Sequence, residues 1–85
     1  MRERDSSVPR EVLILGYLHN IGVTSPNRSL TLEEISIRTA LEAEIVRENI
    51  MKLIKGEYVN MIRVEGVERY YVTPNGILKA AGVYS

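Results

Sequence analysis

LTLEEISIRTALEAEIVRENIMKLIKGEYV, residues 30–59, has the pattern of two short amphipathic helices joined by a tight turn and followed by a strand. Thr31 and Glu34 have the spacing of a capping box, so a helix is predicted to begin at about Leu32. Gly56 is suited to ending the second helix, which is predicted over residues 43–55. Together these features predict a helix-turn-helix.

The second of these helices separates its apolar and polar residues onto different faces. The apolar positions recur at the spacing of one helical face and are expected to enter the core: Val46, Ile50, Leu53 and Ile54. The polar positions are predicted to lie outside that face: Glu44, Arg47, Glu48, Asn49 and Lys52. From the sequence as a whole, the core is predicted to include Leu15, Leu18, Ile35, Val46, Ile50 and Leu53.

Two stretches rich in β-branched and aromatic residues follow, residues 58–64 and 69–73. Residues 65–68 between them contain the glycine expected of a hairpin loop. On the second strand, Tyr70 and Val72 share one face and should pack on the helices. On the first strand the alternation leaves open which set faces the core, although Val59 suggests the set that also contains Met61 and Arg63. Ser29-Leu30 is a candidate for a short additional strand.

The first helix is predicted over residues 9–21, between a proline and Gly22, and the last over residues 74–81, after Thr73-Pro74. The first helix has apolar residues on more of its circumference than one small core requires, including Leu13 and Tyr17. Two explanations remain open. The C-terminal helix of the same chain covers this surface, or equivalent helices of a partner subunit do.

Composition limits the classes of function. With 85 residues the chain is expected to form one domain, residues 9–85, behind a flexible tail, residues 1–8. Eleven basic and eleven acidic residues balance, so there is no overall field that attracts nucleic acid. The absence of cysteine excludes disulfides and thiol catalysis. No apolar run has the length of about 20 residues that spans a bilayer, so we expect a cytoplasmic protein.

The order helix, helix-turn-helix, hairpin, together with YYVTPNGILKA at residues 70–80, resembles the small winged-helix transcription regulators of archaea and bacteria, of the MarR and PadR type. The resemblance covers about residues 9–81. It implies an α+β, mostly α fold with a three-helix core, a β-hairpin wing and a short C-terminal helix. It also implies that the second helix of the motif enters a DNA major groove while the wing reaches the flanking backbone.

Carried onto this sequence, the resemblance implies two groups of DNA contacts. Side chains of the second helix would read bases: Glu44, Arg47, Glu48, Asn49 and Lys52. Residues around the first helix of the motif and in the wing would contact phosphate: Arg28, Ser29, Thr31, Arg38, Arg63 and Arg69. A homodimer is expected to bind an inverted repeat, with an interface built from the first and last helices: Leu13, Gly16, Tyr17, Leu78 and Val83.

A second hypothesis is a winged-helix protein-interaction module within a transcription or replication complex. Residues 42–55 contain three acidic and three basic side chains, which predicts weak binding to random DNA. Ile37, Ile45 and Met51 are apolar residues that are unusual on a DNA-binding face. An enzyme is not expected, because no paired nucleophile, phosphate-binding glycine loop or metal-ligand spacing is present, and no cofactor is implied.

Overall fold

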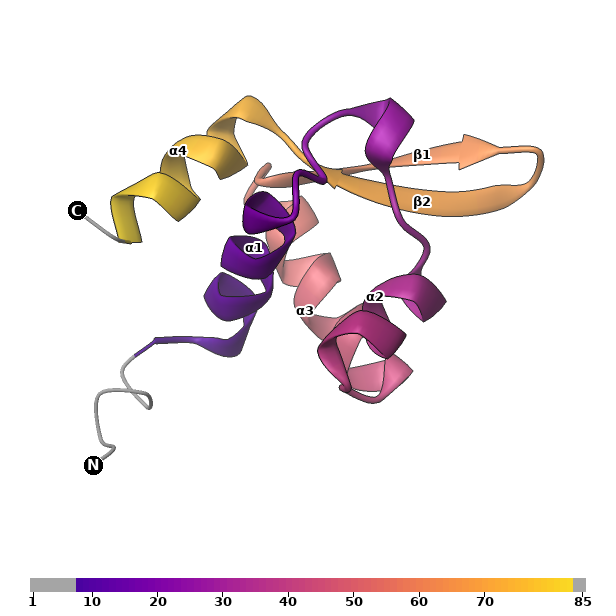
Figure 1. Ribbon diagram of the computed structural model, residues 1–85, viewed down its shortest axis with the longest axis horizontal. Coiled ribbons are helices and arrows are strands. Elements are labelled where there is room, and N and C mark those ends of the chain that lie inside the picture. The colour runs from indigo at the N-terminus through magenta and orange to yellow at the C-terminus, as the bar shows by residue number, and fades with distance from the viewer. Residues whose placement is uncertain (1–7, 84–85) are drawn as a thin grey trace.

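Three helices pack around one core, a hairpin projects beyond them, and a fourth helix returns to lie beside the first in the computed structural model of the protein (Figure 1). The structure describes residues 8–83. The elements are α1 (Arg10–Asn20), the 3-10 helix η2 (Pro26–Arg28), α2 (Leu32–Thr39), α3 (Ala43–Lys55), β1 (Val59–Val64), β2 (Val67–Val72) and α4 (Pro74–Val83). This is a winged helix-turn-helix, as the sequence predicts.

The helix-turn-helix is formed by α2 and α3. The backbone N–H of Glu34 donates to Thr31 Oγ1 (3.1 Å), and the backbone N–H of Thr31 donates to Glu34 Oε1 (2.9 Å), so the predicted capping box is confirmed. The turn begins at Ala40, whose φ of 60° is left-handed. This conformation is costly for a residue with a Cβ atom. Ser36 on α2 donates its hydroxyl to the carbonyl of Leu41, which ties the turn to the preceding helix.

The hairpin pairs β1 with β2 in an antiparallel register that runs from Val59↔Val72 to Val64↔Val67. Its turn contains only Glu65 and Gly66, both with positive φ, which is the geometry that matches the natural twist of two-residue hairpins. The prediction that residues 65–68 form the loop is therefore wrong at its second half, since residues 67 and 68 belong to β2.

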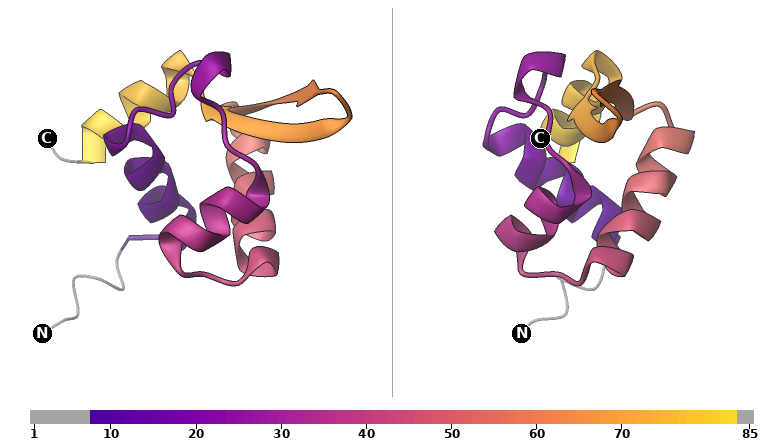
Figure 2. Two further views of the ribbon diagram at one scale, coloured as in Figure 1. Left: turned by 45° about the vertical axis from the view of Figure 1, so that its right-hand side comes forward. Right: turned by 90° about the vertical axis from the view of Figure 1, so that its right-hand side faces the viewer.

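A third segment joins this small sheet on its other edge. The backbone groups of Leu30 and Tyr70 exchange two hydrogen bonds of 2.7 and 3.0 Å, so the expected short strand is reduced to an isolated bridge at Leu30. The N–H of Val72 also donates to the carbonyl of Val23 (2.8 Å). The base of the wing is thus attached to the segment between α1 and α2, whereas its tip extends past the helices (Figure 2).

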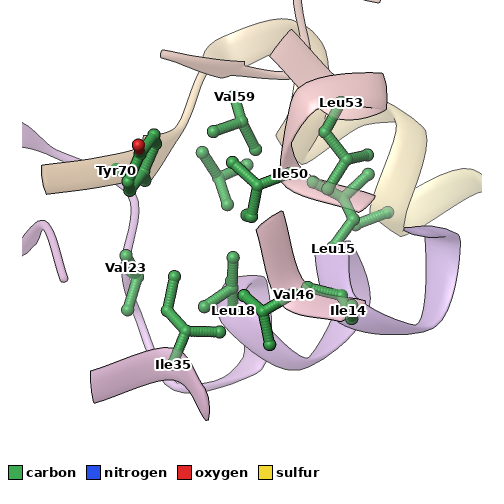
Figure 3. Close-up of a cluster of buried hydrophobic side chains, with 12 residues drawn as sticks. Ile14, Leu15, Leu18, Val23, Ile35, Val46, Ile50, Leu53, Val59 and Tyr70 are labelled. Carbon is green, nitrogen blue, oxygen red and sulfur yellow. The ribbon is translucent and has the colours of Figure 1, made fainter. Parts of the chain in front are cut away.

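The core lies where α1, α2, α3 and the base of the hairpin meet (Figure 3). All six predicted core residues are buried, and Val23, Val59, Tyr70 and Val72 join them. Met61 and Arg63 share a strand face with Val59 but are exposed, because that part of β1 projects beyond the helices. The face suggested for the first strand is therefore buried only at its first residue.

Thr73 and Gly76 attach α4 to the rest of the fold. Thr73 donates its N–H to the carbonyl of Tyr58 (3.0 Å) and its hydroxyl to that of Glu57 (2.8 Å), while the same hydroxyl accepts the N–H of Gly76 (3.0 Å). Helix α4 then packs along α1. Part of the α1 surface is therefore covered by the same chain, which was one of the two explanations left open. Within residues 8–83 no helix is long and apolar enough to cross a membrane.

Candidate nucleic-acid interface

One face of α3 is exposed and polar, and it lies on the side of the helix away from the core. Its residues are the predicted base readers Glu44, Arg47, Glu48 and Lys52, together with Met51, which is 45% exposed. None of the four charged side chains forms an ion pair within the described part of the chain. The face is therefore free to contact a partner, with two negative and two positive charges along it.

Asn49 does not belong to this face, so its prediction as a base reader is wrong. It is only 6% exposed, and its side-chain amide donates to the carbonyl of Ile45, one turn earlier in α3 (2.7 Å). Asn49 follows Val46 by three residues and precedes Leu53 by four, which places it on the buried stripe. The helical spacing alone could have revealed this.

Three side chains of the wing form a series of polar contacts. They lie on the face of the hairpin that packs into the core at its base. Arg63 and Glu68 are directly opposite each other, and Arg63 Nη2 donates to Glu68 Oε2 at 2.7 Å. The other carboxylate oxygen of Glu68 accepts the hydroxyl of Tyr70 at 3.1 Å. Tyr70 itself is buried, so its hydroxyl fixes Glu68 from the core side.

A residue of α3 also contributes to the electrostatics of the contacts between Arg63, Glu68 and Tyr70. Hydrogen bonds from Arg63 and then from Tyr70 lower the pKa of Glu68, and the positive charges of Arg63 and Arg47 act in the same direction. Burial, followed by the hydrogen bond to Glu68, raises the pKa of the Tyr70 hydroxyl. Arg47 on α3 and Arg63 on β1 therefore act on one carboxylate, that of Glu68.

Ser29 and Arg69 serve the fold instead of forming an exposed phosphate site. Ser29 is buried, and Arg69 donates to Ser29 Oγ (3.2 Å) and to the Ser29 carbonyl (2.7 Å). Arg69 also lies 3.7 Å from Glu34 Oε1. These contacts attach β2 to the segment before α2. The predicted phosphate role of Ser29 is wrong because the residue is inaccessible, and Arg69 already has partners within the chain.

The remaining predicted phosphate contacts lie in different parts of the structure. The hydroxyl of Thr31 caps α2 and is half-buried. Arg28 is exposed, with its guanidinium beside Gly22 at the end of α1. Arg38 lines a groove of about 350 Å³ between α1 and α2, together with Leu13 and Tyr17. Of the predicted arginines, Arg63 bonds Glu68 in the wing, and the charge of Arg47 on α3 acts on the same carboxylate.

The predicted dimer surface is partly exposed. Leu13 is 55% exposed and Leu78 is 73% exposed, whereas Tyr17 is half-buried. Gly16 is buried by elements of its own chain, so it is not open to a partner helix and its assignment is wrong. The side chain of Val83 and residues 1–7, which are all but the last residue of the predicted flexible tail, lie outside the described residues.

Comparisons with known proteins agree with the geometry. No family model matches the chain, and no curated protein matches it. The fold is similar to the solution structure of the DNA-binding TubR fragment from Clostridium botulinum, with a TM-score of 0.70 and 28% sequence identity. The likeness covers 86% of this chain and 89% of that fragment.

Proposed function

We propose that this protein binds double-stranded DNA, with α3 in the major groove and the β1–β2 hairpin on the flanking backbone. One observation carries the proposal. A fragment described as DNA-binding shares the fold over 86% of this chain at 28% identity, and in this chain a helix with an exposed polar face, α3, is followed directly by the hairpin. In winged-helix proteins this pairing of helix and hairpin is the part that contacts DNA.

We further propose that the binding is sequence-specific. The chain has no net charge, and the exposed face of α3 carries acids beside its bases, so phosphate neutralisation supplies little affinity. Contacts to base edges must then supply more of the affinity for DNA. Arg47 has the geometry for two hydrogen bonds to guanine, and Glu48 is able to accept from cytosine.

A homodimer is the form that fits this proposal. Leu13 and Leu78 are large apolar side chains left in solvent on α1 and α4, and a domain of this size gains stability from burying such surface. Two recognition helices held at a fixed spacing would bind an inverted repeat with half-sites about one helical turn apart. We propose transcription regulation as the role, without a catalytic step. Sedimentation that shows only monomer at high micromolar concentration would refute the dimer.

The central experiment is selection of binding sites from random duplex DNA, followed by titration of the selected site with variants. Arg47→Ala is expected to weaken binding by about 1 to 3 kcal/mol and to relax selectivity at one base pair. Glu48→Ala separates two roles. A glutamate that reads cytosine loses specific binding when removed, whereas one that only repels phosphate gains non-specific binding.

Asn49→Ala is the matched control on the same helix, because its side chain is buried and bonded to Ile45. It is expected to lower stability without altering the base preference. If the wild type selects no sequence at low salt, or if Arg47→Ala and Glu48→Ala both leave binding unchanged, the proposal fails.

A protein-interaction module remains the second candidate, because several large apolar side chains are exposed. Ile37 on α2 is 80% exposed, and Val64 and Val67 form an apolar pair at the wing tip. A minor-groove probe would carry arginine or lysine at that tip. A failed DNA selection combined with loss of a cellular binding partner on Ile37→Ser would favour this candidate.

A further inference from the structure

Arg63 in the wing is bonded to an acid of the same hairpin. Arg63 is the only basic residue of β1, and its guanidinium bonds the carboxylate of Glu68 on the paired strand at 2.7 Å. In a winged helix that approaches DNA through α3 and the wing, a cation at this position would contact a backbone phosphate. Glu68 therefore already binds the Arg63 guanidinium, which is the group that would contact a phosphate.

Glu68 differs from an ordinary exposed acid because both of its oxygens are bonded. Tyr70 is buried in the core, and its hydroxyl donates to the oxygen of Glu68 that Arg63 does not use (3.1 Å). The carboxylate is therefore held in place from the core side while its other oxygen holds Arg63. Because Arg63 and Tyr70 lower its pKa, Glu68 is negatively charged at neutral pH.

We propose that Glu68 competes with DNA phosphate for Arg63 and thereby sets the ratio of specific to non-specific binding. The inference rests on the proposed function, since it concerns the same DNA-binding face. A random duplex offers few base contacts. These contacts do not offset the free energy needed to separate Arg63 from Glu68 and to place a phosphate near this carboxylate. At a preferred sequence the contacts of α3 bring the wing into position, and the exchange of partners then occurs within a bound complex.

The charge of Arg47 on α3 favours the same carboxylate, because it lowers the pKa of Glu68 together with Arg63. A phosphate that bonds Arg63 must approach this negative charge. Charges within a Debye length of about 10 Å interact at ordinary ionic strength, so Glu68 weakens the backbone contact even after Arg63 has been released.

The test compares Glu68→Gln with Glu65→Gln. Both variants remove one negative charge from the same hairpin, but Glu65 lies in the exposed turn and forms no ion pair among residues 8–83. Binding of each to a random duplex is measured across a salt series. Breaking an exposed ion pair costs only a small free energy, so the effect of Glu68 on binding is modest. Glu68→Gln is expected to tighten random-duplex binding about 1.5- to 5-fold more than Glu65→Gln. Its binding constant should also fall more steeply with salt, by up to one phosphate contact.

The double variant Arg63→Ala, Glu68→Gln shows whether the effect acts through Arg63. In the Arg63→Ala background, Glu68→Gln should give no more than the gain seen with Glu65→Gln. Equal gains from Glu68→Gln and Glu65→Gln in the wild-type background would overturn the inference while leaving DNA binding intact. So would a Glu68→Gln gain that persists without Arg63. If no variant binds any duplex at low salt, the proposed function fails and the inference fails with it.

Discussion

Substitution of Gly76 by alanine should break the attachment of α4 to the hairpin. A Cβ atom at this position would overlap the carbonyl oxygen of Tyr58 and lie 2.6 Å from Val72 Cγ1. One of these neighbours is backbone, and the other is a buried valine, so neither moves without disturbing the fold. The carbonyl of Tyr58 also accepts the N–H of Thr73, so moving it weakens that hydrogen bond as well.

The size of the effect follows from three contributions. Overpacking at a rigid site costs about 1 to 3 kcal/mol. Weakening the bond between Thr73 and Tyr58 adds about 1 kcal/mol. The higher helix propensity of alanine returns about 1 kcal/mol. The net loss of unfolding free energy is therefore about 1 to 3 kcal/mol, which in a domain of this size lowers the Tm by about 5 to 20 °C.

Gly82→Ala is the matched control within the same helix. A Cβ atom built at Gly82 meets no atom within 4 Å, so this variant is expected to be as stable as the wild type or slightly more stable. Thermal and urea unfolding, followed by circular dichroism, would compare the three proteins. A Gly76→Ala protein that unfolds together with the wild type would show that α4 does not approach Tyr58 as closely as described.

Four further predictions concern the core, the turn and the wing. Ile50→Ala should cost about 2 to 5 kcal/mol in urea unfolding, because the side chain is fully buried; an unchanged midpoint would mean that the buried face of α3 is misassigned. Ala40→Gly should raise stability by up to about 1 kcal/mol, because glycine adopts the left-handed conformation without a Cβ penalty; a lower Tm would contradict this. Arg63→Ala should weaken binding to the selected site and reduce its salt slope by about 0.9, with a smaller effect on random duplexes, where Arg63 stays bonded to Glu68; a change in which base is preferred would argue against a phosphate contact. The pKa of the Tyr70 hydroxyl is raised in the folded protein, so the stability from its neutral form is fully present below the unfolded value and is lost as pH rises through the folded one. Tyrosinate absorbance should therefore show Tyr70 ionising above pH 10.0, and Glu68→Gln should bring that titration down.

Local signals in the sequence predicted much of this fold correctly. The capping box at Thr31 and Glu34 and the apolar spacing of α3 act over one or two helical turns, so the residues that determine them are close in sequence. Asn49 is the exception, because its polarity indicates an exposed position whereas the same spacing assigns it to the buried stripe. Polarity is a weak guide where a neighbouring carbonyl accepts the hydrogen bond, as Ile45 does here.

The candidate site was harder to predict because its contacts join distant segments. Arg69 bonds Ser29 forty residues away, and no local pattern announces that pairing. The contact between Arg63 and Glu68 depends on the hairpin turn instead. Once the turn is confined to residues 65 and 66, the register that places these two side chains opposite each other follows directly.

The attachment of the wing at its base has a mechanical consequence. The hydrogen bonds of Leu30 with Tyr70 and of Val23 with Val72 hold the hairpin up to Tyr70. Beyond Arg69, whose side chain also bonds Ser29, the backbone of the described hairpin is supported only by its own two-stranded ladder. Amide hydrogens at the base should therefore exchange with solvent only when the whole domain opens, while those at the tip exchange through local opening. The base of the wing is therefore rigid and its tip is more flexible. The Arg63–Glu68 contact lies in the flexible part, where Arg63 can exchange one partner for another without disturbing the core.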